Sequence, residues 1–531
     1  MSDKSLVQFG GYWEIPDSII NSEISISSEF SKDIKEIRKY YEQYKKGCEF
    51  KANQGSLQYV PSMVRFKKAA DLINKEARFM FAKTPEVTVK STKPNLTVGD
   101  ETIKSEIVLL QTLINRVLNE NAFGENILKA AKDCAIGERI AMVLNFNTTD
   151  GITLTFLPST NFVFEVEPGR QNKLKKFVGF VVNSESSDIG EKRIFKKKMY
   201  LHEKTGKCVV EDSVYNGLGE IVEEPEEIIT RFDELPVAIV RNDGLLGDIF
   251  GESEMEKLSD YESLLSKSMN AGIDAERMCM NPIRYAIDAS EESTKELSVV
   301  PGSFWDIQSD QMSEGNKSAQ VGILETSMAY ASPLKESLER IRAAMYDTLD
   351  MPDISLPTMT GVITSGKALK SIYWGLIVRC EEKMKMWKPA LRFICETIIE
   401  GARIFPDVAK MYIEQPVPLN EEYEVVVENQ YPIQEDELEE KASDIVEVNA
   451  QLMSKKAYMM KWRCLTDEEA EEELAQIAKE RQLLEDSFEM PAFVDTSTEE
   501  EGLIEEEEKL KGAEQKVKDD IMIEKEEEVE E

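Results

Sequence analysis

The sequence predicts an α+β fold, with helices first, a mostly antiparallel sheet after them and long helices again toward the C-terminus. Apolar residues recur every three to four positions over 62–83, 103–119 and 123–136, which is the spacing of amphipathic helices. From residue 139 the spacing falls to two in short runs separated by turn residues, which is typical of strands. From residue 251 the helical spacing returns and dominates as far as residue 487. This order of segments is typical of an α+β protein.

Composition limits the classes of function. The 531 residues are 41% hydrophobic, enough for a sizeable core divided among several regions. The net charge of -37 argues against a protein that grips nucleic acid, because phosphate binding needs clustered Lys and Arg. An acidic chain can still surround DNA without holding it.

Few side chains are suited to catalysis or metal binding. The seven cysteines form no C-x-x-C pair, which favours reduced thiols that are mostly small core residues. His202 is the only histidine, and its alternating surroundings favour an ordinary half-exposed strand residue. Zinc sites and the Ser-His-Asp triad therefore lack their usual parts, and no metal or cofactor is expected. No secretory signal is visible, and no apolar run is long enough to span a bilayer.

The first half of the chain is predicted to contain most of the sheet. Helices are expected over 29–46 and 62–83; Thr84-Pro85 ends the second, and a strand follows at 86–90. Gly137 is expected to cap the helix over 123–136. Further strands are predicted at 139–146, 152–157, 162–166, 177–183, 195–203, 208–215 and 237–241.

The second half is predicted to be mainly helical. An insert of short strands at 283–330 separates two helices, of which the second is expected to open at Ser332-Pro333. The first, over 252–278, carries an apolar face made of Met255, Leu258, Tyr261, Leu265, Met269 and Ile273.

After a loop of small residues at 351–366, a helix over 367–404 is expected to kink at Pro389. A strand at 422–428 and helices over 435–452 and 466–487 complete the pattern, with Thr466 and Glu469 as a capping box for the last. The final segment, 499–531, has a net charge of -11, which favours a disordered or solvated tail.

Two motifs have competing interpretations. The run GVITSGKA at 361–368 nearly matches a phosphate-binding loop, but Ala368 stands where the Mg²⁺-binding hydroxyl is required, which favours a flexible loop. Lys335, Arg340 and Arg342 on the helix after the insert could meet DNA phosphates. A solvated face or ion pairs between subunits would explain them equally well.

Five segments, taken in order, resemble the portal proteins of long-tailed bacteriophages. The run KKAADLINKEARFMFAKTPEVTV resembles the family's early helix, and CAIGERIAMVLNFNTTDGITLTFLPSTNFVFEVE resembles its wing. The run GDIFGESEMEKLSDYESLLSKSMNAGIDAERMCMNPI resembles the first stem helix entering the clip. The run TSGKALKSIYWGL resembles the step after the tunnel loop, and YPIQEDELEEKASDIVEVNAQLMSKKAYMM resembles the crown helices. The series covers roughly residues 60–485.

The resemblance implies a subunit with successive regions along the chain. These are an N-terminal arm (1–60), a wing with a mostly antiparallel sheet (61–250), a first stem helix (251–278), a clip (279–330), a second stem helix (331–350), a tunnel loop (351–366), a long kinked wing helix with a strand (367–430), crown helices (431–490) and an acidic tail (491–531).

It also implies a ring, usually of twelve copies, at one capsid vertex of the virion, assembled in the host bacterial cytoplasm. Double-stranded DNA would pass through it during packaging and ejection, without sequence-specific binding. The implied partners are the terminase large subunit, a head-completion or adaptor protein, and the major capsid and scaffolding proteins. The tunnel loop would contribute Met351, Leu356, Thr358, Met359, Thr360, Gly361, Thr364 and Gly366, and Lys335, Arg340 and Arg342 are candidates for tunnel-facing basic residues.

Two other functions compete with a channel. An NTP-driven motor would need an intact P-loop and a strand-borne acidic partner, which the sequence lacks, so no enzymatic activity is expected. An acidic scaffold or adaptor without a DNA channel would not need a sheet region as elaborate as that predicted at 60–250.

Overall fold

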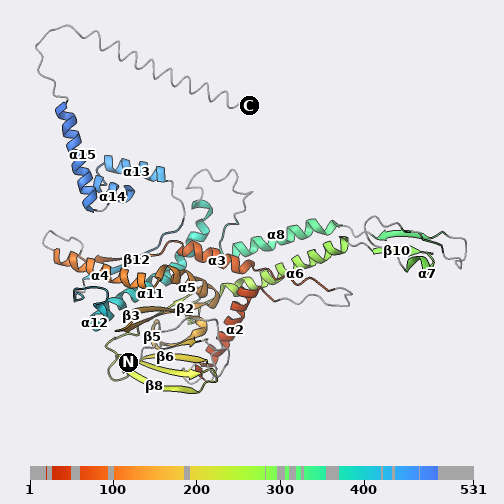
Figure 1. Ribbon diagram of the computed structural model, residues 1–531, viewed down its shortest axis with the longest axis horizontal. Coiled ribbons are helices and arrows are strands. Elements are labelled where there is room, and N and C mark those ends of the chain that lie inside the picture. Colours follow the sequence, from red (N-terminus) through yellow and green to blue (C-terminus); the bar gives the residue numbers. More distant parts are fainter. Residues whose placement is uncertain are drawn as a thin grey trace, which may run out of the picture. The chain divides into compact units, whose positions relative to one another are not determined.

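The structure is a computed structural model, and it describes residues 19–20, 27–49, 60–93, 101–183, 192–280, 283–295, 305, 307–309, 318–324, 328–353, 370–419, 422–432, 437–463, 465 and 467–487 (Figure 1). The chain divides into two compact units, Met1–Glu435 and Asp436–Glu531. The mixture of helices and antiparallel sheets confirms the predicted α+β class.

The first unit is layered around strand β2 (Arg139–Asn147), which is buried on both faces. Ile140 and Met142 face a core shared with helices, whereas Ala141 and Val143 face a second core shared with another sheet. Burial on both sides explains why this strand reads as a nearly continuous apolar run. β2 pairs antiparallel with β3 (Gly151–Pro158) and β9 (Val237–Arg241).

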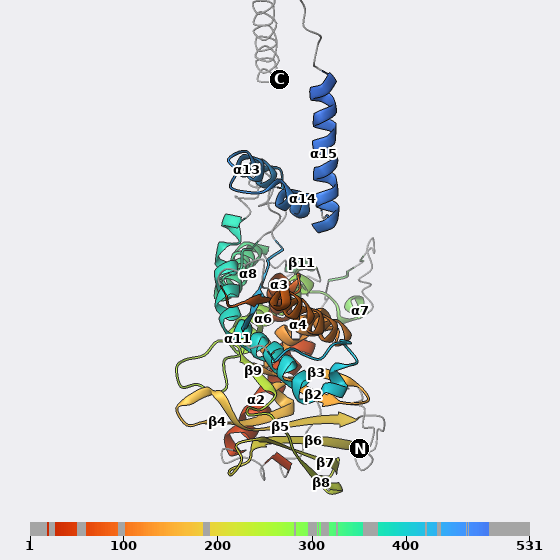
Figure 2. The same ribbon diagram turned by 90° about the vertical axis from the view of Figure 1, so that its left-hand side faces the viewer.

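Helices cover one face of this three-stranded sheet, and a second sheet covers the other (Figure 2). The helical layer contains α3 (Lys68–Phe81), α4 (Glu101–Glu120), α5 (Phe123–Gly137), α11 (Trp374–Ile404) and α12 (Pro406–Ala409), with the antiparallel pair β1 (Glu86–Ser91) and β12 (Tyr423–Glu428) beside it. The second sheet is an antiparallel meander of β4 (Phe162–Glu167), β5 (Arg170–Asn183), β6 (Arg193–Leu201), β7 (Cys208–Asn216) and β8 (Ile221–Ile229).

Helix α2 (Ser27–Lys46) lies in the segment that the sequence assigned to an N-terminal arm, yet it packs into both cores. Phe30 and Ile34 belong to the core under the meander. Arg139 of β2, fully buried, pairs with Asp33 of α2 and lies 3.2 Å from Glu138. Its guanidinium also lies over the Phe250 ring, 4.8 Å from the centroid, so aromatic contact and ion pairing both offset the desolvation of this charge.

All seven strands predicted between 139 and 241 are present, within a few residues of their bounds except for β5, which starts at Arg170 instead of 177. β8, with the sequence IVEEPEEII, was missed because every residue in it is exposed, so no apolar alternation marks it. Pro225 is tolerated there because β8 is an edge strand and the register is irregular around it.

Several predicted helix ends are wrong. α3 starts at Lys68, not at residue 62. The left-handed residue after α5 is Glu138, and Gly137 is still helical; a Cβ on Gly137 would lie 2.3 Å from Ser159 Oγ, so a close approach explains this glycine. α8 (Ala331–Thr348) is preceded by a 3-10 turn, Met328–Tyr330, so the predicted opening at Ser332-Pro333 falls inside its first turn. α11 starts at Trp374 after a break at Tyr373, but residues 370–372 before the break are also helical, and Pro389 lies within α11 without ending it.

Within its described residues, the second unit contains the helices α13 (Glu437–Asn449), α14 (Lys455–Arg463) and α15 (Asp467–Ser487). α14 was not predicted because it has only nine residues, four of them Lys or Arg, and Met459 is its buried residue. Asp444 of α13 accepts hydrogen bonds from Lys461 Nζ and Trp462 Nε1, both at 2.7 Å, which ties α13 to α14. The proposed capping residue Thr466 and the tail 499–531 lie outside the described residues.

Candidate functional site: a helix pair with a buried polar base

Two long helices with a small hairpin between them form the most distinctive feature of the first unit. α6 (Glu254–Met280) packs along α8, and the chain between them contains the antiparallel strands β10 (Ile283–Ile287) and β11 (Gln320–Leu324) and the short helix α7 (Glu291–Thr294) (Figure 1). Gly272 allows the close approach, since a Cβ there would lie 2.6 Å from Leu334 Cδ2. The hairpin exposes apolar residues, including Tyr285 and Ile323.

The predicted apolar face of α6 is correct only at its start and along its contact with α8. Met255 and Leu258 are fully buried, Leu265, Met269 and Ile273 are half-buried, and Tyr261 is exposed. The buried stripe that continues along the helix is polar. It consists of Glu262, Ser266, Asn270 and Asp274, spaced four residues apart.

This polar stripe binds the backbone of the extended segment that precedes α3. Ala69 N donates to Glu262 Oε1 at 2.9 Å, and Phe66 N donates to Ser266 Oγ at 3.4 Å. Asn270 exchanges two hydrogen bonds with Val64, of 2.8 and 2.7 Å. Asp274 accepts from Ser62 N at 3.0 Å. These bonds explain why α3 does not begin at residue 62, because its backbone N–H groups there are directed at α6.

The two periodicities match. Four residues of a helix rise ~6.0 Å, and two residues of an extended chain advance ~6.6 Å, so every fourth side chain of α6 meets every second N–H of the segment 62–66. The sequence signal was available as polar residues at a constant spacing of four, but a stripe of this kind is ordinarily read as a solvated face.

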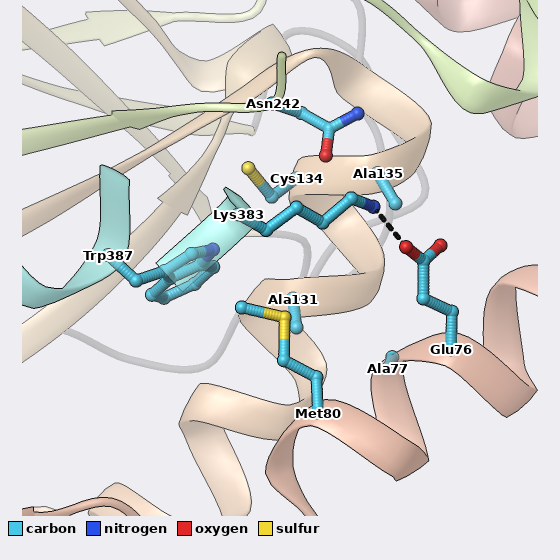
Figure 3. Close-up of a pocket in the computed structure, with 9 residues that line it drawn as sticks. All are labelled: Glu76, Ala77, Met80, Ala131, Cys134, Ala135, Asn242, Lys383 and Trp387. Atoms are coloured by element: carbon cyan, nitrogen blue, oxygen red, sulfur yellow. Dashed lines mark ion pairs between the residues drawn. The ribbon is translucent and has the colours of Figure 1, made fainter. Parts of the chain in front are cut away.

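Four charged side chains meet where α3, α6 and α11 converge. Glu76 of α3 and Glu254 of α6 are buried, and Arg379 and Lys383 of α11 lie between them. Arg379 Nε is 2.8 Å from Glu76 Oε1, and its Nη2 is 2.7 Å from Glu254 Oε1. Lys383 Nζ lies 2.6 Å from Glu76 Oε1 (Figure 3). It also contacts Glu254. Each carboxylate therefore contacts both cations.

The two carboxyl groups differ in their affinity for protons. Burial, and next the charge of Glu254, raise the pKa of Glu76 to about 7. Burial also opposes ionisation of Glu254, but Lys383 and a hydrogen bond from Glu76 hold the pKa of Glu254 well below its usual range. A protonated Glu76 can donate to Glu254, which leaves one negative charge instead of two adjacent ones.

A small cavity lies beside this cluster. Its volume is about 10 Å³, and its lining includes Met80, Cys134, Asn242, Lys383 and Trp387 (Figure 3). A space of this size holds about one water molecule, so the cluster is a structural junction with no room for a substrate.

Only residues 351–353 of the proposed tunnel loop are described. Met351 is buried, and its N–H donates to Tyr346 O at 3.0 Å, which turns the chain sharply after α8. The remaining candidates, Leu356, Thr358, Met359, Thr360, Gly361, Thr364 and Gly366, lie outside the described residues, as does the P-loop-like run at 361–368.

The three basic candidates on α8 all have an acidic neighbour in the same chain. Lys335 lies 3.9 Å from Glu339, Arg340 lies 3.2 Å from Glu336 and Arg342 lies 2.5 Å from Asp353. Arg342 also lies over the ring of Tyr346, whose hydroxyl accepts hydrogen bonds from Lys68 and Lys75. Burial opposes ionisation of Tyr346, but these two lysines lower the pKa of its hydroxyl.

His202 follows β6, half-buried in a turn, where its Nδ1 accepts hydrogen bonds from the backbone of Lys204 and Thr205 at 3.3 Å. Within the described residues, no cluster of His, Cys, Asp and Glu is arranged to hold a metal ion. Among those same residues, no helix is both long and apolar enough to cross a membrane.

Comparison with known proteins gives one family. The family model described as "Phage portal protein, SPP1 Gp6-like" matches residues 21–484. No curated protein matches the chain. The match covers most of the chain, including the helical layer, the three-stranded sheet, the meander, the α6–α8 pair and the helices of the second unit, so the chain belongs to the phage portal protein family.

Proposed function

We propose that this protein forms the portal ring of a bacteriophage capsid, the channel through which double-stranded DNA is packaged and ejected. The α6–α8 pair is the stem, β10 and β11 belong to the clip, the sheets with their helices form the wing, and the second unit is the crown. The segment 351–366 is the tunnel loop. Twelve copies surround the channel.

The observation that carries this proposal is the attachment of the α6–α8 pair. Its base is fixed by the polar stripe against residues 62–69 and by the Glu76–Glu254–Arg379–Lys383 cluster, whereas its far end exposes an apolar hairpin. An arm held rigidly at one end with apolar residues at the other suits a subunit that repeats the same contact around a ring.

The charge distribution supports passage of DNA without tight binding. Lys335, Arg340 and Arg342 each lie beside a carboxylate of the same chain, so the described part of α8 presents no cluster of uncompensated positive charge. With a chain net charge of -37, few phosphate counterions would be displaced, and the duplex can slide. The energy for packaging then comes from the terminase large subunit, and the portal itself performs no catalysis. Head-completion, capsid and scaffolding proteins are its other partners.

Electron microscopy of the purified full-length protein tests the proposal. Rings with a central opening wide enough for duplex DNA are the expected result, and the class averages give the copy number. Monomers, or closed oligomers without an opening, under conditions where the protein is folded would refute the channel and favour an acidic scaffold or adaptor.

A further inference from the structure

The loop between β9 and α6 presents two leucines to solvent on a rigid support. Leu246 is fully exposed and Leu245 is 81% exposed, and among the described leucines of this unit only Leu419 is comparably exposed. Asp248 N donates to Leu245 O at 3.0 Å, and Gly247 has a φ of +98°, which are the marks of a type II turn with Leu246 at its first corner. The turn directs the Leu246 side chain outward.

Several hydrogen bonds and two ion pairs hold the base of this loop together. Glu252 N donates to Asn242 O at 2.8 Å, and Asn242 Nδ2 donates to Glu252 O at 2.9 Å. Asp248 accepts from Phe250 N and Gly251 N, and Arg241 Nε donates to Ile249 O. Lys257 joins Asp243 and Glu252 at 2.9 and 2.7 Å. An exposed apolar pair held in one conformation loses little entropy when it docks, so the loop is preorganised for binding.

A groove of suitable chemistry lies elsewhere on the same chain. It has a volume of about 600 Å³ and runs between α6 and α8. Its apolar lining is formed by Leu265, Met269, Ile273, Leu334 and Leu338. Its rim combines Lys68, Lys335 and Arg342 with Glu276 and Glu339, so docking there would rest on the apolar lining.

The geometry points to docking of the Leu245–Leu246 turn of one subunit in the α6–α8 groove of a second copy of this chain. Because both leucines are exposed, the loop does not occupy the α6–α8 groove of its own subunit. A contact between two different surfaces of one protein is heterologous, and such contacts close into rings when the rotation allows it. The inference rests on the proposed ring and names side chains of its subunit interface.

Cross-linking between subunits tests it directly. Leu246→Cys is combined with Leu338→Cys in the full-length chain, and the assembled protein is treated with a short bismaleimide. A ladder of covalent dimers and larger multimers is expected on denaturing gels. Leu218→Cys with Leu338→Cys is the matched control, because Leu218 is also an exposed leucine in a turn (64%) but lies between β7 and β8. The single variants account for reaction of native cysteines.

Mixing the two single variants before assembly should give dimers without a ladder, because each subunit then carries half of the contact. A ladder no stronger than that of the Leu218 control refutes the inference. A cross-link formed within one subunit, which leaves the protein at the mass of a single chain on the gel, refutes it as well. Imaging of the same sample separates the two hypotheses: rings without the ladder overturn this contact and leave the portal ring standing, while absence of both overturns both.

Removing the apolar pair gives an independent measurement. Leu245→Ser with Leu246→Ser should raise the protein concentration at which rings dissociate by at least tenfold, whereas Leu218→Ser should leave it unchanged. Equal dissociation of the double variant and the wild-type protein would refute a docking role for the turn.

Discussion

The charged cluster at the base of the helix pair makes a strong prediction for Lys383→Met. Methionine keeps the length and the helix propensity of lysine but removes the ammonium, so that two carboxylates face the single cation Arg379. The Lys383 side chain is only 12% exposed, so bulk water cannot compensate for the lost charge. Removing one partner of a buried ion pair typically costs about 3–5 kcal/mol.

Protonation of Glu76 should relieve part of that cost, which gives the deficit a characteristic dependence on pH. The pKa of Glu76 is already about 7 in the wild-type protein and rises further when Lys383 is removed. Above pH 7 the folded variant then keeps a proton that the folded wild-type protein loses. Stability of the variant relative to wild type should fall by about 1.4 kcal/mol for each pH unit, or about 2 kcal/mol between pH 7 and pH 8.5.

Urea unfolding followed by tryptophan fluorescence measures this, since Trp387 lines the adjacent cavity. Lys385→Met is the matched control, because Lys385 is exposed on the same helix and its loss should change stability by less than about 0.5 kcal/mol. A deficit below about 1 kcal/mol, or one that is equal at pH 6 and pH 8.5, would refute the assignment of a buried, proton-sensitive junction.

Four further predictions concern the helix pair and its surroundings. Burial raises the pKa of Glu262 from 4.5 to about 7, so the stability that this carboxyl contributes is complete below about pH 4.5 and is lost as the pH rises through 7. In urea unfolding, Glu262→Gln should therefore be as stable as wild type at pH 5 and more stable by up to ~3 kcal/mol at pH 8.5. Equal stability of the two proteins at pH 8.5 would contradict this. Asn270→Ala removes both hydrogen bonds between the buried Asn270 side chain and the Val64 backbone and should cost ~1–3 kcal/mol, with faster hydrogen exchange at Val64, whereas Lys267→Ala on the exposed side should do neither. Gly401→Ala would place a Cβ 2.1 Å from Phe146 Cε1, whose ring is stacked against Phe405, so it should lower thermal stability by ~1–3 kcal/mol despite the better helix propensity of alanine, and a gain in stability would show that the ring can move. Deletion of 356–363 should leave rings intact in electron microscopy but give empty or partly filled capsids, and normal filling would place the constriction elsewhere.

Much of the fold was predictable because local signals agreed with tertiary structure. β2 and its neighbours have apolar residues wherever a core exists, so a continuous apolar run or an alternating pattern identified each strand. β8 failed for the opposite reason: an edge strand with both faces exposed has no pattern to detect. The wrong start of α3 has a nonlocal cause, since residues 62–66 are helix-compatible but their N–H groups bind acceptors some two hundred residues away on α6.

The functional part was less accessible from sequence. The loop 351–366 and the basic residues of α8 stood out as unusual local composition, whereas Glu76, Glu254, Arg379 and Lys383 looked like ordinary surface charges on three amphipathic helices. Only the convergence of α3, α6 and α11 makes them a cluster, and no single-helix pattern predicts that. The same applies to Leu245 and Leu246, whose exposure depends on how the turn is held.

Polar contacts at the base of the helix pair have a consequence that apolar packing would not have. Apolar side chains tolerate sliding, because the buried area changes little when one surface moves over another. The stripe Glu262, Ser266, Asn270 and Asp274 fits residues 62–69 in one register, and a shift of one residue would direct the acceptors at carbonyls and outward-pointing groups. Since buried hydrogen-bonding groups left unpaired cost ~1–3 kcal/mol each, neighbouring registers are several kcal/mol higher in energy. The direction of α6 relative to the sheets is therefore fixed within each subunit, which is the condition for identical contacts to close into a ring.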